Sequence, residues 1–218
     1  LKISEKEFIK KTDATFKQSI KFVNWNVSSK YSSYHHNFSQ PLNAELFNYA
    51  EYWAQHNDSI NTPYNYACTI QSALSDECRA PKLITDPDYG GSLNYAYHFD
   101  AGKFAGYLKE IAIGKGVKHF VDHIVDVELD DEENIQQLML KGGLSVNGDL
   151  LIDCSGFAAL LIEKSLTVEF YSLSDVLFVD SVVTASVAHR DLSQLPSYTT
   201  STAQNSGWIW DIGLQTRR

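Results

Sequence analysis

The segment from Asp149 to Gly156 constrains the fold most, because an apolar run is followed directly by two small residues and then by a helical pattern. The run predicts a short buried strand over 149–154, Ser155 and Gly156 predict a tight exit, and 157–164 predicts a helix. A buried strand that ends in this way brings backbone amides and a helix N-terminus close to an anionic group such as a phosphate. From spacing alone, a plain strand-to-helix turn is the better interpretation.

The rest of the chain alternates helical and strand patterns. Ser4 to Glu7 forms a capping box that predicts a helix, and Asp100 predicts another that Gly114 ends. A helix is also expected after Asn43, an ordered loop over 26–42, and a strand of about six residues within 15–25. Strands are expected over 117–129 and 135–140, separated by the acidic turn Asp130–Glu133, and Gly142-Gly143 predicts a further turn. This order predicts a mixed α/β fold in one domain or part of one.

Composition narrows the function classes. The 218 residues carry 18 basic and 27 acidic side chains, a formal net charge of −9, so a clustered basic surface for nucleic acid is not expected. No apolar stretch is long enough to span a bilayer, so no membrane role is expected either. Three cysteines without CxxC spacing favour a reducing, cytoplasmic compartment. Because the chain begins at Leu1 within a helical pattern, we expect an internal piece of a longer protein.

Several residues are candidates for chemistry, each with a simpler alternative. Lys17 enters an apolar strand, where a lysine either reaches back to solvent, the favoured interpretation from the residues alone, or is placed for catalysis. The loop residues Tyr34 to Phe38 could form an aromatic platform or a surface loop, and adjacent histidines in an extended loop point apart, so no metal site is expected. His98 and Asp100 could be a catalytic pair, but a helix-capping role for Asp100 is preferred.

Five segments in collinear order resemble the flavin-dependent tryptophan halogenases over nearly the whole chain. They are Asp13 to Phe22, which carries Lys17, the loop His36-Asn-Phe38, the block Asn94 to Ala101, the turn Asp149 to Phe157, and Ser206 to Ile212 with its Trp-x-Trp pattern. Two positions depart from the family pattern: Gly213 replaces a proline and Ala158 replaces a frequent arginine.

The resemblance implies an FAD-dependent monooxygenase-like (glutathione-reductase-type) fold, here incomplete. Residues 1–218 would be the central part of a single halogenase domain, without the N-terminal Gly-rich FAD loop and the C-terminal part; no Gly-x-Gly-x-x-Gly fingerprint occurs in the chain. In the family, reduced FAD from a separate flavin reductase, O2 and chloride or bromide yield hypohalous acid, which reaches a lysine beside the indole of tryptophan.

The resemblance also assigns roles to individual residues. Lys17 would be the catalytic lysine, and His36 and Phe38 would flank the indole. The residues expected near the cofactor are Ile124, Asp153, Ser155 and Gly156, and those expected to form a wall between substrate and flavin are Trp208, Trp210 and Ile212.

Two alternatives stay open. The parent enzyme could act on another aromatic substrate, such as a free indole, a phenol or a pyrrole, as a halogenase or a monooxygenase. The chain could instead be a catalytically inactive fragment that acts at most as a binding module.

Overall fold

The computed structural model describes residues 2–26 and 31–218, which divide into two compact units. The first comprises residues 1–112 and 183–218, and the second comprises residues 113–182. Each unit is described by itself below. The expectation that residues 1–218 belong to a single halogenase domain stays a prediction.

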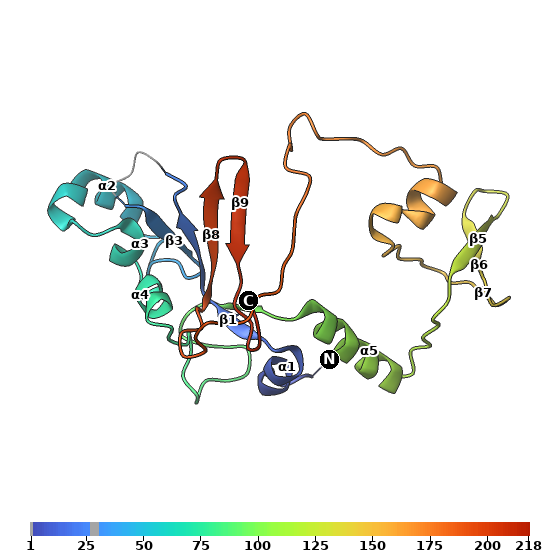
Figure 1. The fold of residues 1–218 in the computed structure, drawn as a ribbon, viewed down its shortest axis with the longest axis horizontal. Coiled ribbons are helices and arrows are strands. Elements are labelled where there is room, and N and C mark those ends of the chain that lie inside the picture. Colours follow the sequence, from blue (N-terminus) through green and yellow to red (C-terminus); the bar gives the residue numbers. More distant parts are fainter. Residues whose placement is uncertain (1, 27–30) are drawn as a thin grey trace. The chain divides into compact units, whose positions relative to one another are not determined.

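The first unit begins with helix α1 (Glu5–Thr12), as the capping box predicts (Figure 1). The Ser4 hydroxyl accepts a hydrogen bond from the Glu7 amide at 3.2 Å, which satisfies one of the free donors of the first turn. Asp13 ends the helix in a left-handed conformation, and the chain turns into the strand that carries Lys17.

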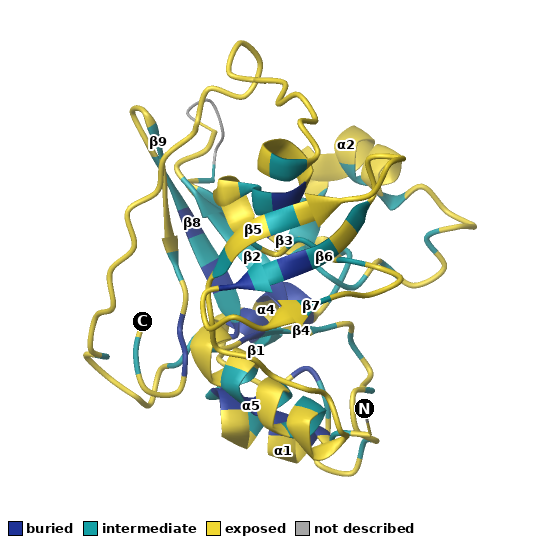
Figure 2. Ribbon diagram, turned by 90° about the vertical axis from the view of Figure 1, so that its right-hand side faces the viewer, coloured by how far each residue is buried: buried dark blue, intermediate teal, exposed yellow. Residues whose placement is uncertain are grey.

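A four-stranded sheet organises this unit, in the order β3-β2-β8-β9. The strands are β2 (Ser19–Val23), β3 (Ser33–Asn37), β8 (Tyr198–Gln204) and β9 (Gly207–Asp211). Strands β2 and β8 pair in parallel, and the other pairs are antiparallel. Buried positions alternate along β8, whereas β9 is mostly exposed (Figure 2). A second, two-stranded sheet pairs β1 (Thr15–Lys17) with β4 (Ala96–His98).

The loop expected over 26–42 is wrong in part, because residues 33–37 form the edge strand β3; residues 27–30 lie outside the described residues. The polar sequence Ser-Tyr-His-His-Asn lacks an apolar alternation, and its strand depends on pairing with β2. The helix expected after Asn43 begins later, as α2 (Tyr49–Ile60) with Asn48 as its cap. Two short helices follow, α3 (Tyr64–Ala67) and α4 (Gln71–Asp76).

The prediction for the next helix is confirmed. Helix α5 (Ala101–Gly114) ends at Gly114, and the Asp100 carboxylate accepts from the Lys103 amide at 3.0 Å. In the second unit, β5 (Ile124–Leu129), β6 (Ile135–Leu140) and β7 (Ser145–Val146) form an antiparallel sheet. The acidic turn Asp130–Glu133 and the Gly142-Gly143 turn connect these strands as predicted, whereas the strand expected over 117–129 begins only at Ile124.

The strand expected over 149–154 is wrong: no strand forms there, and the helix after it is short and irregular, a 3-10 turn (Gly156–Ala158) followed by a π-helical segment (Leu160–Ser165). The short apolar run cannot hydrogen-bond as a strand without a neighbour, and within the described residues no strand pairs with it.

The mixed α/β fold class is confirmed, since parallel and antiparallel pairs occur in the same sheet with helices packed around it. Among the described residues, none of the helices has the length and apolar character required to cross a bilayer. The most buried side chains of the first unit are polar, and they include Gln18, Ser19, Gln71, Ser72, Ser75 and Ser201.

Candidate active site

Lys17 is the last residue of β1 and is held by a fixed backbone on both sides. In the β1–β4 pair it lies opposite Ala96. The next residue, Gln18, is fully buried; its amide donates to the Ser197 carbonyl at 2.7 Å and its side chain donates to the Arg79 carbonyl at 2.6 Å. The direction in which the lysine leaves the sheet is therefore set by main-chain contacts of its neighbour.

The amine of Lys17 faces an aromatic ring. Its Nζ lies 5.8 Å from the centroid of the Phe38 ring, a cation–π distance. The Phe38 amide donates to the Gln18 carbonyl at 3.1 Å, which fixes the two segments against each other. The predicted proximity of Lys17 and Phe38 is thus found in the structure.

Phe38 directly follows the end of β3 at Asn37, and His36 is the last residue but one of that strand. Its pairing partner on β2 is Ile20, and its side chain is exposed. His35 points to the opposite face and is buried. Adjacent histidines therefore point apart, as the sequence predicts, while the indole-flanking role of His36 and Phe38 stays a prediction.

Burial lowers the pKa of Lys17 below that of a free lysine. Among the residues that the structure describes, no carboxylate forms an ion pair with this amine, whereas Lys21, Lys82 and Lys103 each have one. A half-buried amine without a counter-charge loses its proton more readily than a solvated one, because burial disfavours the charged form. It is therefore suited both to donate hydrogen bonds and to act as a nitrogen nucleophile.

His98 is a neighbour of Lys17 whose position the sequence did not reveal. It pairs with Thr15 and so shares a strand face with Lys17. Its Nε2 lies 2.8 Å from Thr199 Oγ1, and its Nδ1 is buried without a hydrogen bond in the part of the chain described here. Asp100, its supposed catalytic partner, caps α5 and binds Arg217 at 2.9 Å.

Burial, and then the charge of Lys17, lower the pKa of His98 to about 4. The imidazole should therefore stay neutral at physiological pH. We expect Lys17→Met to raise the pKa of His98, because the substitution removes the nearby positive charge, while Lys10→Met on exposed α1 leaves it unchanged. NMR titration of the imidazole protons measures both, and an unchanged His98 pKa in Lys17→Met would contradict the proximity of the two groups.

The tryptophans of β9 form an aromatic cluster with a third member. The rings of Trp208 and Trp210 are 6.0 Å apart, and Trp25 lies 5.9 Å from Trp208. The Trp25 indole donates to the Ser201 carbonyl at 2.9 Å. Both β9 tryptophans are partly exposed in this chain, at 39% and 62%.

A hydrogen bond connects the segment that follows β9 with β1, the strand that ends at Lys17. Ile212 follows β9, and the Thr15 hydroxyl donates to the Gly213 carbonyl at 2.6 Å. A Cβ at Gly213 would make only ordinary contacts with Leu195 and Pro196. The replacement of the family proline by Gly213 therefore leaves this connection in place. The role of Trp208, Trp210 and Ile212 as a wall beside the flavin stays a prediction.

The turn expected near the cofactor belongs to the second unit. Asp153 accepts hydrogen bonds from the amides of Ser155 and Leu161, both at 2.9 Å, and the Ser155 hydroxyl accepts from the Leu160 amide. Hydrogen bonds from the Ser155 side chain and from these amides lower the pKa of Asp153 to about 2. Several amides that could bind a phosphate are thus already occupied by this chain's own side chains.

Gly156 differs from its neighbours in this turn. Its φ is +64°, and a Cβ built there meets no heavy atom within 4 Å, so the backbone is open to close approach. Ile124 is the first residue of β5 and pairs with Leu140. The cofactor-binding roles of Ile124, Asp153, Ser155 and Gly156 stay predictions.

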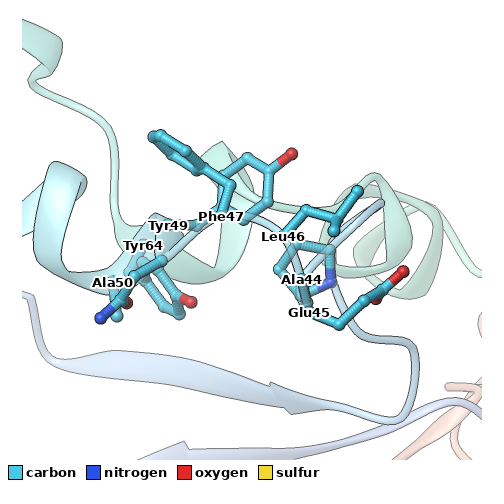
Figure 3. A pocket seen from close by; sticks show the side chains of 9 residues that line it. Ala44, Glu45, Leu46, Phe47, Tyr49, Ala50 and Tyr64 are labelled. Atoms are coloured by element: carbon cyan, nitrogen blue, oxygen red, sulfur yellow. The ribbon is translucent and has the colours of Figure 1, made fainter.

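A pocket with a volume of about 410 Å³ is formed by the segment 41–50 and by Tyr64 (Figure 3). Its lining includes the aromatic side chains of Phe47, Tyr49 and Tyr64, and Lys17, His36 and Phe38 are not part of it. The pocket is therefore separate from the lysine–phenylalanine pair.

Comparisons of sequence and fold identify relatives of this chain. The family described as tryptophan halogenase matches residues 1–218. The tryptophan 6-halogenase ThaL of Streptomyces albogriseolus is 33% identical, over 98% of this chain and 43% of its own length. The crystal structure of a tryptophan halogenase from Shewanella frigidimarina superposes with a TM-score of 0.90 at 37% identity, over 99% of this chain and 42% of that one. Xcc4156, a flavin-dependent halogenase from Xanthomonas campestris, gives a TM-score of 0.84 at 31% identity, over 96% of this chain and 41% of that one.

The fold therefore places the chain in the class of flavin-dependent halogenases. Within that class, the chain belongs to the tryptophan halogenase family. It spans less than half the length of the relatives it matches.

Proposed function

We propose that the whole protein halogenates tryptophan or a related indole, with Lys17 as the catalytic lysine. The observation that carries the proposal is the half-buried Lys17 amine, which has no carboxylate partner among the described residues and lies 5.8 Å from the Phe38 ring centre. An electrophilic halogen needs a donor or a nucleophile beside the ring that it attacks, and this amine supports both roles.

Lys17 can act in two ways, as a protonated or as a neutral amine. In its protonated form the amine donates hydrogen bonds to hypohalous acid and polarises the oxygen–halogen bond. In its neutral form, which burial makes more accessible, its nitrogen lone pair can take the halogen from hypohalous acid, whose oxygen leaves as water with a proton of the amine. The ring then takes the halogen as the nitrogen–halogen bond breaks, and the ring proton restores the amine. Either route requires the reacting carbon of the substrate to be close to Nζ.

His36 and Phe38 are proposed to hold the substrate ring, because they are separated by one residue at the end of β3 and Phe38 is already beside the lysine. A ring stacked against flat side chains has few orientations, so one carbon would be presented to Lys17. Trp208, Trp210 and Ile212 are proposed to separate the substrate from the flavin.

Reduced FAD, together with O2 and chloride or bromide, would supply hypohalous acid when bound. The open Gly156 backbone fits close approach of a cofactor, with Ser155 beside it and Ile124 as a further backbone contact. Asp153 would hold the turn rigid through its bonds to the backbone. A separate flavin reductase is the proposed source of the reduced cofactor.

The direct test supplies the whole protein with a flavin reductase, FAD, NADH, L-tryptophan, and chloride or bromide. Mass spectrometry should detect tryptophan heavier by one halogen in place of one hydrogen. A panel with free indole, a phenol and a pyrrole tests the alternative substrates. If one of these compounds is halogenated and tryptophan is not, the tryptophan assignment is wrong; if neither tryptophan nor any of them is halogenated, the halogenase proposal fails.

The inactive-fragment alternative is tested on the 218-residue chain itself. Because its sequence lacks the Gly-x-Gly-x-x-Gly fingerprint, we expect no FAD binding at micromolar concentrations in a fluorescence titration. Micromolar or tighter binding would contradict this expectation.

The three cysteines are unpaired in the structure, which supports a reducing, cytoplasmic compartment.

A further inference from the structure

A polar cluster around the buried His35 side chain lies on the other side of the strand that carries His36. His35 has a fully buried side chain, with Nδ1 2.8 Å from Ser19 Oγ and Nε2 3.1 Å from Asp76 Oδ1. The Lys21 amine donates to the same Asp76 oxygen at 2.6 Å, and the Tyr66 hydroxyl donates to the other one. One imidazole thus joins β3 to β2 and to helix α4.

The partners of His35 define its tautomer. Although burial raises the pKa of Asp76, hydrogen bonds from Lys21 and Tyr66 lower it overall, so its carboxylate is ionised and only accepts hydrogen bonds. Nε2 of His35 therefore carries the proton, and Nδ1 accepts from the Ser19 hydroxyl. Burial lowers the pKa of His35 despite the neighbouring carboxylate, which keeps the ring neutral.

The cluster fixes the register of the strand pair. His35 lies opposite Lys21 and His36 lies opposite Ile20, so the two histidines use opposite faces of the same pairing. A slip of one residue would exchange these faces and turn His36 inward. It would also move Phe38, whose amide now bonds to the carbonyl of the residue after Lys17.

Stability alone is a weak reason for such a cluster. Burying the polar His35 ring carries a desolvation cost that its hydrogen bonds only offset, and the Lys21–Asp76 ion pair is partly exposed, at 23% and 31%, so it adds little stability. A hydrogen-bonded network specifies one geometry more sharply than apolar packing, because each donor must meet its own acceptor.

We propose that His35 is a positioning residue that fixes where His36 and Phe38 stand relative to Lys17. The inference rests on the proposed function, since its consequence is the orientation of the substrate ring. His35 does not contact the substrate. It acts through strand β3, whose other face carries His36.

The test compares His35→Asn and Ser19→Ala with the unaltered protein in the tryptophan assay. Asparagine is too short to reach both partners, and alanine removes one partner with little change of volume. We expect kcat to fall roughly 10-fold or more and the share of minor ring isomers in the product to rise several-fold. Partial unfolding would lower the yield of all isomers equally, so the isomer ratio separates positioning from stability.

A second measurement does not depend on activity. Hydrogen exchange of the Phe38 amide should be faster in both variants, because its bond to Gln18 depends on the register of β3. His56→Asn is the matched control, since His56 is an exposed histidine of helix α2. If the unaltered protein halogenates nothing, the proposed function fails and the exchange data alone decide the positioning role. Folded His35→Asn and Ser19→Ala proteins with unchanged Phe38 exchange, or with an unchanged isomer ratio in an active enzyme, would overturn it.

Discussion

Replacing Lys17 with alanine should abolish halogenation in the whole protein, with a loss of roughly 10³-fold or more, while the fold is retained. The substitution removes the amine that lies beside the Phe38 ring, so that hypohalous acid has no partner next to the substrate. The aliphatic part of Lys17 is only half buried, so the effect on stability should be small. Product formation, followed by mass spectrometry, measures the loss.

Two comparisons make this result specific. Lys10→Ala, on the exposed face of α1, should leave the rate unchanged. FAD binding by the whole protein should also be unchanged in Lys17→Ala, because the residues proposed to meet the cofactor belong to other segments. A Lys17→Ala enzyme that halogenates within a few-fold of the normal rate would remove Lys17 from the mechanism.

The sequence predicts best those elements whose signals are local. The cap at Ser4 and the cap at Asp100 each need only a few neighbouring residues, and both helices form as predicted. The strands on either side of the acidic turn are likewise encoded by their own apolar pattern. Mixed α/β architecture follows from the order of such elements.

Elements that depend on distant partners are predicted poorly. Strand β3 has a polar sequence, and it is a strand because β2 supplies its hydrogen bonds. The run 149–154 has the composition of a strand but no pairing partner within the described residues, and it forms none. The pattern around a residue does not report whether a partner is present.

The same distinction holds at the site. Resemblance placed Lys17 beside Phe38, and their distance supports it. It did not find the contact between His98 and Thr199, which are far apart in sequence. Nor did it find the His35–Asp76 contact, because no local pattern signals a buried histidine between two strands and a helix. The pair of adjacent histidines was the one available hint, since strand geometry forces one of them inward.

Glu5→Gln should destabilise the fold strongly. The Glu5 carboxylate is 5% exposed, accepts from Lys82 at 2.5 Å and from the Tyr95 hydroxyl at 2.7 Å, and also accepts from Tyr97. It thereby ties helix α1 to the segment around residues 82–97. Glutamine leaves the Lys82 amine without its counter-charge, and breaking a buried ion pair costs about 3 kcal/mol. Urea denaturation at pH 7 measures the free energy of unfolding.

The effect should vanish in acid, and the direction follows from the pKa of Glu5. Burial raises that pKa, but hydrogen bonds from Lys82, Tyr97 and Tyr95 outweigh it and lower the value from 4.5 to about 2. A carboxyl group whose pKa is lowered by folding stabilises the fold above its unfolded value and loses that contribution as the pH falls toward its folded value. The stability difference between the unaltered chain and Glu5→Gln should therefore be complete above pH 4.5 and shrink toward pH 2. Glu110→Gln, at an exposed position of α5, is the matched control and should show no such dependence. If the stability difference caused by Glu5→Gln stays constant from pH 7 to pH 2, the Glu5 carboxylate is not ionised and paired as described.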